Sequence, residues 1–146
     1  MGIFRSIILY NNQKLAESKD NKMISTLTPE AIEKLEKQQT IWFGSVRPDG
    51  KPHLTPVWFV WHDGKLYVGI DPNSVKSRNL KKNPWVVLAL EDGSHPVICE
   101  GMAAFTPPPL TEALTAAFHS KYEWDLTKEA QYNQIVEITP FKWLTW

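Results

Sequence analysis

The residues of this chain that are best suited to bind a charged ligand lie close together at residues 71–82, DPNSVKSRNLKK. Four cations fall within seven residues there: Lys76, Arg78, Lys81 and Lys82. Ser74 is expected to cap a short helix that carries them. The N–H groups at a helix start, a hydroxyl and two or more cations can together hold an anion such as phosphate. A solvated basic turn of helix explains the same residues, and this segment alone favours that simpler interpretation.

The rest of the composition narrows the classes of function. The chain has 16 Lys and Arg against 16 Asp and Glu, and this balance argues against a general nucleic-acid-binding protein. Its four histidines are scattered without metal-ligand spacing, so no metal site is expected. The single cysteine, Cys99, excludes an internal disulfide and fits the reducing cytoplasm. The apolar run at residues 7–10 is too short to span a membrane, so no membrane partner is expected.

The elements that must position the basic segment form a mainly β domain at residues 24–146, preceded by an optional extension at residues 1–23. Apolar runs bounded by turn residues predict six strands, at residues 40–46, 52–61, 65–70, 85–91, 97–105 and 134–138. Helices are expected at residues 29–38, capped by Thr28 and lying across an opening in the sheet, and at residues 111–122. Short hairpin connections predict an antiparallel, barrel-like sheet with helices outside it.

The strand at residues 52–61 is unusual because both of its faces are largely apolar. Trp58 and Val60 alternate with Val57 and Phe59 along it, so we expect both faces to be covered. Pro56 cannot donate a hydrogen bond to a neighbouring strand, which predicts an edge, a bulge or a neighbour that is not a strand. A bulge is the commonest of these, and the edge of a ligand is another.

Two further features concern the end of the chain. Gly101, inside a predicted strand, indicates a bulge or a close approach of two backbones. The last residues carry three large aromatic side chains, Phe141, Trp143 and Trp146. We therefore expect this terminal segment to dock against its own subunit or another one.

An ordered set of motifs resembles the pyridoxamine 5′-phosphate oxidase-like, FMN-binding split-barrel family. The set comprises the RPDG turn at 47–50, G-x-P-H-x-T-P-V-W at 50–58, Ser-x-Lys-x-Arg-Asn-Leu at 74–80, N-P-x-V-x-L at 83–88, and a tail ending in Trp. Each motif is weak alone, but their order across residues 41–91 is specific, and the resemblance covers residues 24–146. It favours the anion-binding interpretation of Lys76 and Arg78.

The resemblance implies a six-stranded antiparallel split barrel that forms a homodimer, with two FMN molecules in the grooves between subunits. It places the second strand along the flavin ring, through His53, Thr55, Pro56, Val57 and Trp58. It places the ribityl chain or phosphate near Gly69 and Ile70, and the phosphate itself at Ser74, Lys76 and Arg78. Thr55 and Val57 stand where the true oxidase has more polar contacts, so a general flavin-dependent member is expected rather than pyridoxamine phosphate oxidase.

Several functions are compatible with this resemblance. The first is an FMN-dependent oxidoreductase that acts on a small-molecule substrate and is reduced by NAD(P)H or by that substrate. The second uses the deazaflavin F420, and the third is a flavin- or haem-binding carrier or sensor without turnover. A barrel without a ligand is the fourth. Flavin chemistry proceeds through the cofactor's own ring, so no side chain is assigned a catalytic role.

Overall fold

Six strands and three helices make up the part of the chain that the computed structural model describes, residues 27–146. The strands are β1 (Thr40–Val46), β2 (Pro52–His62), β3 (Lys65–Ile70), β4 (Trp85–Ala89), β5 (Val97–Thr106) and β6 (Gln134–Thr145), and the helices are α2 (Pro29–Lys37), α3 (Val75–Lys82) and α4 (Glu112–Tyr122). The strands close into an antiparallel barrel in the order β1-β2-β3-β6-β5-β4. This confirms the predicted fold class; the predicted extension at residues 1–23 lies outside the described residues.

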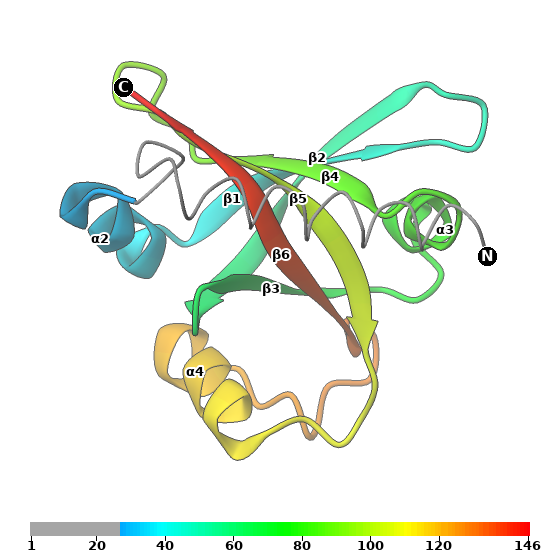
Figure 1. Ribbon diagram of the computed structural model, residues 1–146. Helices are drawn as coiled ribbons and strands as arrows, with labels where there is room; N and C mark the ends of the chain where they lie inside the picture. The colour runs from blue at the N-terminus through cyan, green and yellow to red at the C-terminus, as the bar shows by residue number, and fades with distance from the viewer. Residues whose placement is uncertain (1–26) are drawn as a thin grey trace.

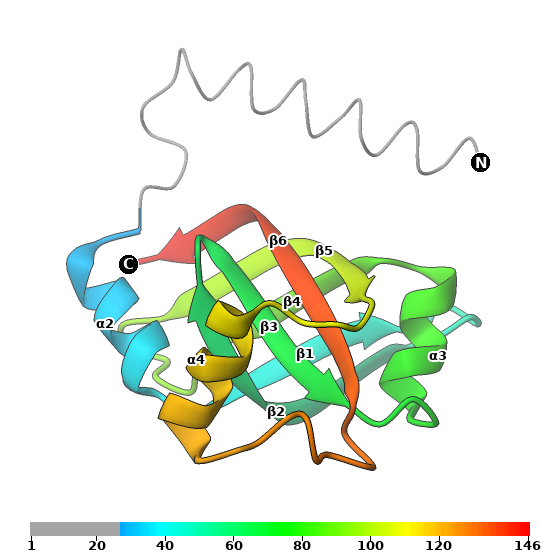
Figure 2. The ribbon, with the colours of Figure 1, turned by 90° about the horizontal axis from the view of Figure 1, so that it is seen from below.

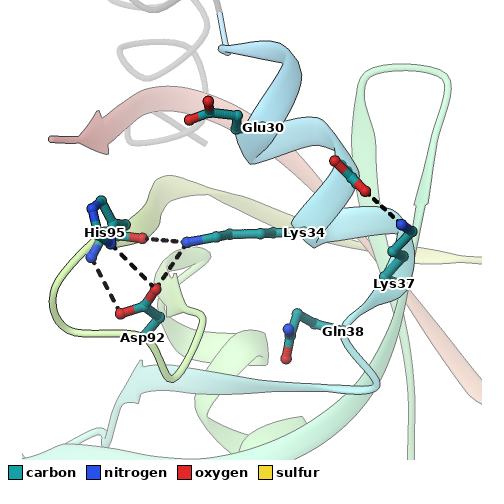
Figure 3. A pocket seen from close by; sticks show the side chains of 7 residues that line it. Glu30, Lys34, Lys37, Gln38, Asp92 and His95 are labelled. Atoms are coloured by element: carbon teal, nitrogen blue, oxygen red, sulfur yellow. Dashed lines mark hydrogen bonds and ion pairs between the residues drawn. The ribbon is translucent and has the colours of Figure 1, made fainter.

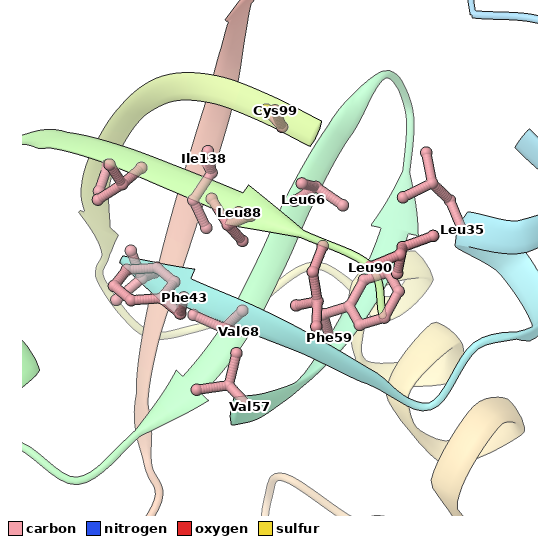
Figure 4. Packing of buried hydrophobic residues seen from close by; sticks show 14 of the residues in the cluster. Leu35, Phe43, Val57, Phe59, Leu66, Val68, Leu88, Leu90, Cys99 and Ile138 are labelled. Carbon is pink, nitrogen blue, oxygen red and sulfur yellow. The ribbon is translucent and has the colours of Figure 1, made fainter. Parts of the chain in front are cut away.

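The helices lie at the ends and on the outside of the barrel (Figures 1 and 2). Large apolar side chains from the strands fill the interior, among them Phe43, Phe59 and Leu88, and α2 inserts the fully buried Leu35 into this cluster (Figure 4). Thr28 caps α2 by accepting a hydrogen bond from the Ala31 N–H at 3.1 Å, as expected. The alternation of apolar residues along each strand thus forms one core, which α2 closes at one end.

Charged contacts fasten α2 to the turn between β4 and β5 (Figure 3). The Lys34 ammonium donates to Asp92 Oδ2 at 3.0 Å and to the His95 carbonyl oxygen at 2.9 Å. The hydrogen bond from Lys34 to Asp92, together with those from the Ser94 and His95 N–H groups, lowers the pKa of Asp92 to about 2. The hollow between these elements measures about 490 Å³. Lys34 and Asp92 form an ion pair there. We therefore interpret the contacts around this hollow as the attachment of α2 to the barrel, and not as a ligand site.

The last strand is longer than predicted. β6 pairs with β5 from Thr106↔Ile135 to Val97↔Thr145, and the register shifts between Glu100 and Gly101. Gly101 sits opposite Pro140, and a Cβ on Gly101 would lie 2.7 Å from the Thr139 carbonyl oxygen. The predicted bulge is therefore confirmed. The predicted strand end at residue 138 is wrong because the bulge accommodates the proline.

The terminal aromatic residues thereby become part of the barrel. Trp143 packs against the core and meets Trp61 edge-on, with ring centroids 5.6 Å apart. Trp146 itself is 72% exposed. The expected docking of the terminal segment against its own subunit is confirmed for Trp143, and it takes the form of a strand.

β2 and β3 are paired at one end only and separate over the rest of their length. β2 pairs with β1 along residues 52–58 but with β3 only from Phe59 to His62, and Gly69 and Ile70 of β3 pair with β6 instead. Pro56 thus lies in a stretch with one strand neighbour, as its missing N–H predicted. The expectation that both faces of β2 are covered is wrong for the single chain, because Leu54 is 60% and Trp58 50% exposed.

Candidate functional site

A cavity of about 650 Å³ lies where β2 and β3 separate. The beginning of α3 borders one end of it, and the loop that follows α4 borders another side. Its lining residues are Thr40, Pro56, Val57, Trp58, Gly69, Ile70, Asp71, Ser74, Lys76, Trp124, Glu129 and Tyr132. The separation of the two strands therefore makes the space, and elements distant in the sequence close its sides.

Seven of the ten residues predicted to contact a flavin line this cavity: Pro56, Val57, Trp58, Gly69, Ile70, Ser74 and Lys76. His53 lines a neighbouring hollow with Leu54, Trp85 and Phe141. Thr55 and Arg78 line neither space. Residues from β2, β3 and α3 thus line one cavity, whereas in the sequence only the order of the motifs had related them.

Arg78 lies outside the cavity because of helix geometry. Lys76 and Arg78 are two residues apart in α3, and two residues turn a helix by about 200°. When Lys76 faces the cavity, Arg78 must face away; its guanidinium is exposed and donates from Nη1 to the Asn73 carbonyl oxygen at 2.9 Å. The Arg78 contact with phosphate therefore finds no support in the single chain.

Thr55 shares the face of β2 that points into the barrel with Val57 and Phe59. Its hydroxyl oxygen is buried and has no hydrogen-bond partner among the described residues. A buried hydroxyl without a partner is costly. This orphan atom lies outside the cavity lining, so we assign it no role in the candidate site.

The polar end of the cavity combines a capped helix start with a lysine. The Ser74 hydroxyl accepts a hydrogen bond from the Ser77 N–H at 3.2 Å, which confirms the predicted cap. Lys76 takes part in none of the hydrogen bonds or ion pairs among residues 27–146. Burial lowers the pKa of Lys76, and the nearby Asp71 carboxylate acts in the opposite direction. An unpaired, half-buried cation beside a helix start is suited to an anionic ligand.

The flat side of the cavity is made of aromatic rings. Trp58 stacks on Tyr122 with ring centroids 4.6 Å apart and planes 3° from parallel, and Trp124 meets Trp58 edge-on at 5.8 Å. Tyr122 is fixed in turn, since its hydroxyl accepts from the Phe59 N–H at 2.9 Å and lies 2.7 Å from the Gln39 carbonyl oxygen. The rings form a rigid apolar wall for a planar ligand.

Sequence reasoning missed the loop that follows α4, which contributes Trp124, Glu129 and Tyr132 to the lining. The residue that caps the C-terminus of α4, Glu123, adopts the left-handed conformation with φ 54°, and the loop that follows it borders the cavity. A left-handed helix end normally calls for Gly or Asn. Because Glu stands at this position, no local residue type signals the turn.

Glu129 holds this loop in place. Its carboxylate accepts hydrogen bonds from the Trp124 indole N–H at 2.8 Å and from the backbone N–H groups of Tyr132 at 2.8 Å and Gln131 at 2.9 Å. The Tyr132 and Gln131 N–H groups and the Trp124 indole lower the pKa of Glu129, in that order of effect. One carboxylate therefore positions two of the lining aromatic residues.

Replacing Glu129 with glutamine should loosen this loop. The amide keeps one acceptor oxygen but presents a donor to the Trp124 indole, so we expect the free energy of unfolding to fall. The Trp124 indole N–H resonance, assigned with Trp124→Phe, should shift and broaden in NMR spectra. Glu123→Gln is the matched control because that carboxylate is exposed in the same loop. An unchanged Trp124 resonance in Glu129→Gln would contradict the role.

Residues 27–146 contain no group of three or more His, Cys, Asp or Glu side chains that could hold a metal ion. Within the same range, no helix is long and apolar enough to cross a membrane. The cavity thus presents its chemistry through one cation, two carboxylates, three hydroxyl groups and aromatic rings.

Comparisons with known proteins place these features among relatives. A family model described as pyridoxamine 5′-phosphate oxidase matches residues 27–146. A solved structure described as F420 reductase is 25% identical, with a TM-score of 0.66, and the alignment covers 81% of this chain and 98% of that one. A conserved hypothetical protein from Mycobacterium tuberculosis is 27% identical, with a TM-score of 0.68 and coverage of 84% and 86%.

HutZ from Vibrio cholerae, described as a heme storage protein, is 18% identical, with a TM-score of 0.66 and coverage of 83% and 95%. That identity is low enough that the likeness concerns the fold alone. No curated protein matches the chain significantly. The solved structures thus share the six-stranded barrel while their described ligands differ.

Proposed function

Because the chain belongs to the pyridoxamine 5′-phosphate oxidase-like split-barrel family, whose model matches residues 27–146, we propose that it binds FMN in the cavity between β2, β3 and α3 and acts as an FMN-dependent oxidoreductase. One observation carries the proposal: residues from β2, β3 and α3 that the family resemblance assigns to the flavin line a single cavity, with an unpaired Lys76 at its polar end. Its volume falls in the range of small-molecule sites, about 300–1,000 Å³.

The residues present fit such a cofactor. Lys76 and Ser74 would hold the phosphate, and the Gly69–Ile70 backbone would lie along the ribityl chain. Trp58 and Trp124 would face the ring and keep water from it. When bound, FMN supplies hydride or single-electron transfer to or from a small substrate, with NAD(P)H as a proposed donor. The chain's own part is then to bind and orient, and no side chain is proposed to move a proton.

A homodimer is part of the proposal. Leu54 and Val87 are 60% and 42% exposed beside a hollow that also includes Trp85 and Phe141. A second copy covering this apolar surface would bury the face of β2 that is exposed in the single chain. Sedimentation equilibrium should give twice the monomer mass at micromolar concentration, and a monomer would contradict the groove between subunits.

F420 is the second candidate cofactor. The structure described as F420 reductase is similar to this chain over 98% of its own length at 25% identity. F420 also joins a flat tricyclic ring to a phosphate, so the same lining residues would serve it. A host that lacks F420 would remove this candidate.

The cytoplasm remains the proposed compartment. Cys99 is free and fully buried, and burial, followed by the charge of Glu100, raises its pKa to about 12. Such a thiol is protected from oxidation and would also persist elsewhere. Fractionation of the native host is therefore the direct test.

The visible spectrum of the purified protein tests the proposed function. We expect a yellow protein with flavin absorption bands, or a colourless one that acquires them on titration with FMN, and bleaching by NADH or NADPH would mark an enzyme. Binding of FMN without bleaching by any donor would favour a carrier or sensor. Tight binding of F420 but not FMN would favour the second candidate, and a Soret band a haem protein. Absence of binding to any of these would contradict the proposal.

A further inference from the structure

The charges that line the cavity compensate a phosphate dianion only in part. Lys76 is the single cation in the lining, whereas Asp71 and Glu129 are both carboxylates. Arg78, which the sequence predicted as a second cation at the phosphate, instead donates a hydrogen bond to the Asn73 carbonyl oxygen outside the cavity. A phosphomonoester such as FMN carries a charge of about −1.5 to −2 at neutral pH. With one lysine, the cavity can neutralise only part of it.

The two carboxylates differ in how far their charge is compensated. Glu129 accepts three hydrogen bonds, from the Trp124 indole and two backbone N–H groups. Asp71 accepts one from the Asn73 N–H at 2.8 Å and a long one, at 3.4 Å, from Gln131. Asp71 forms no ion pair among the described residues, yet it lies close enough to Lys76 to affect the pKa of that lysine. Its negative charge is therefore only partly compensated at the end of the cavity where the anion would bind.

Other charged groups near this end are few. Arg47 and Lys76 both contribute to the lowered pKa of His53, after burial, so Arg47 and His53 belong to the same neighbourhood. Neither lines the cavity. Because the pKa of His53 is lowered, its ring is neutral at about pH 7.5, and Arg47 does not replace a second cation beside Lys76 in the lining.

We propose that Asp71 makes the cavity select anions by charge, favouring a group with one negative charge, such as a phosphodiester, over a phosphomonoester dianion. The inference rests on the proposed binding of a flavin phosphate and adds a specificity-determining residue to it. Lys76 attracts either anion, while the repulsion by Asp71 grows with each negative charge on the ligand. For charges roughly 10 Å apart at an effective dielectric constant of about 20, one unit of ligand charge changes the affinity about tenfold.

Three flavins with the same ring and different charges test this inference: riboflavin, riboflavin 4′,5′-cyclic phosphate and FMN. Their dissociation constants are measured by flavin fluorescence at about pH 7.5, where FMN is mostly dianionic. The variants are Asp71→Asn, Asp71→Ser as a second substitution that keeps a short acceptor, and the control Asp63→Asn. Asp63 is exposed in the β2–β3 turn with φ 50°, which asparagine tolerates.

Asp71→Asn and Asp71→Ser should raise the affinity for FMN about tenfold more than that for the cyclic phosphate, and leave that for riboflavin unchanged. Asp63→Asn should alter none of the three. The inference is overturned if the ratio of FMN to cyclic-phosphate affinity stays the same, or if riboflavin affinity changes as much as FMN affinity. If the wild-type protein binds none of the three flavins, both the inference and the FMN proposal fail.

Discussion

Replacing Lys76 with alanine is expected to weaken FMN binding about ten- to a hundredfold, because a hydrogen bond to a charged group contributes about 1.5–3 kcal/mol. Lys76 is the single cation in the cavity lining and has no hydrogen-bond or ion-pair partner among the described residues, so no such interaction is lost with it. The loss should therefore appear in binding rather than in stability. Fluorescence titration with FMN and denaturant unfolding of the apoprotein measure the two effects separately.

Arg78→Ala is the matched control for this prediction. The two cations lie two positions apart in α3, but Arg78 is exposed and bonded to the Asn73 carbonyl oxygen outside the cavity. We expect its removal to change FMN affinity less than about threefold, the effect of one screened surface charge. Equal losses in Lys76→Ala and Arg78→Ala would show that the phosphate binds along the outer side of α3. No loss in Lys76→Ala would move the phosphate elsewhere altogether.

The contrast between Lys76 and Arg78 shows what the sequence could and could not predict about the site. Motif order brought Ser74 and Lys76 into one proposed phosphate site, and the cap at Ser74 is a local feature that local residues determine. Which of two nearby cations faces the cavity depends on how α3 is rotated against the barrel. That rotation is set by buried contacts such as Asn79 Nδ2 to Ser45 Oγ at 3.0 Å, across 34 residues of sequence.

The same distinction holds for the fold. Alternating apolar residues and turn signals located all six strands, because these patterns act over a few residues. The extent of β6 was underestimated because Pro140 ends a strand by local rules, and only its pairing with the bulge at Gly101 explains why the strand continues. Trp124 was missed for a similar reason, since its place in the cavity depends on contacts with Trp58 and Gly69, more than 50 residues earlier in the chain.

Gly69→Ala is expected to destabilise the protein by about 3 kcal/mol, the upper part of the range for inserting atoms into a packed region. A Cβ at Gly69 would lie 2.6 Å from Trp124 Cη2 and 3.1 Å from the Tyr132 carbonyl oxygen. The first contact cannot persist, so the indole must leave its place against β3. The second is with backbone, which resists a shift. Alanine otherwise favours a strand over glycine by about 0.5–1 kcal/mol, so a net loss would be attributable to the contact.

Gly93→Ala separates this contact from the general effect of removing a glycine. Nothing lies within 4 Å of a Cβ at Gly93, and its backbone does not require glycine, so we expect no loss of stability there. Urea unfolding compares the two variants, and the Trp124 indole N–H resonance reports the displaced ring. Because Trp124 also borders the cavity beside Trp58, Gly69→Ala should weaken flavin binding as well. If Gly69→Ala unfolds at the same urea concentration as the wild type and the Trp124 resonance is unchanged, the packing of this ring on β3 does not depend on the absence of a side chain at Gly69.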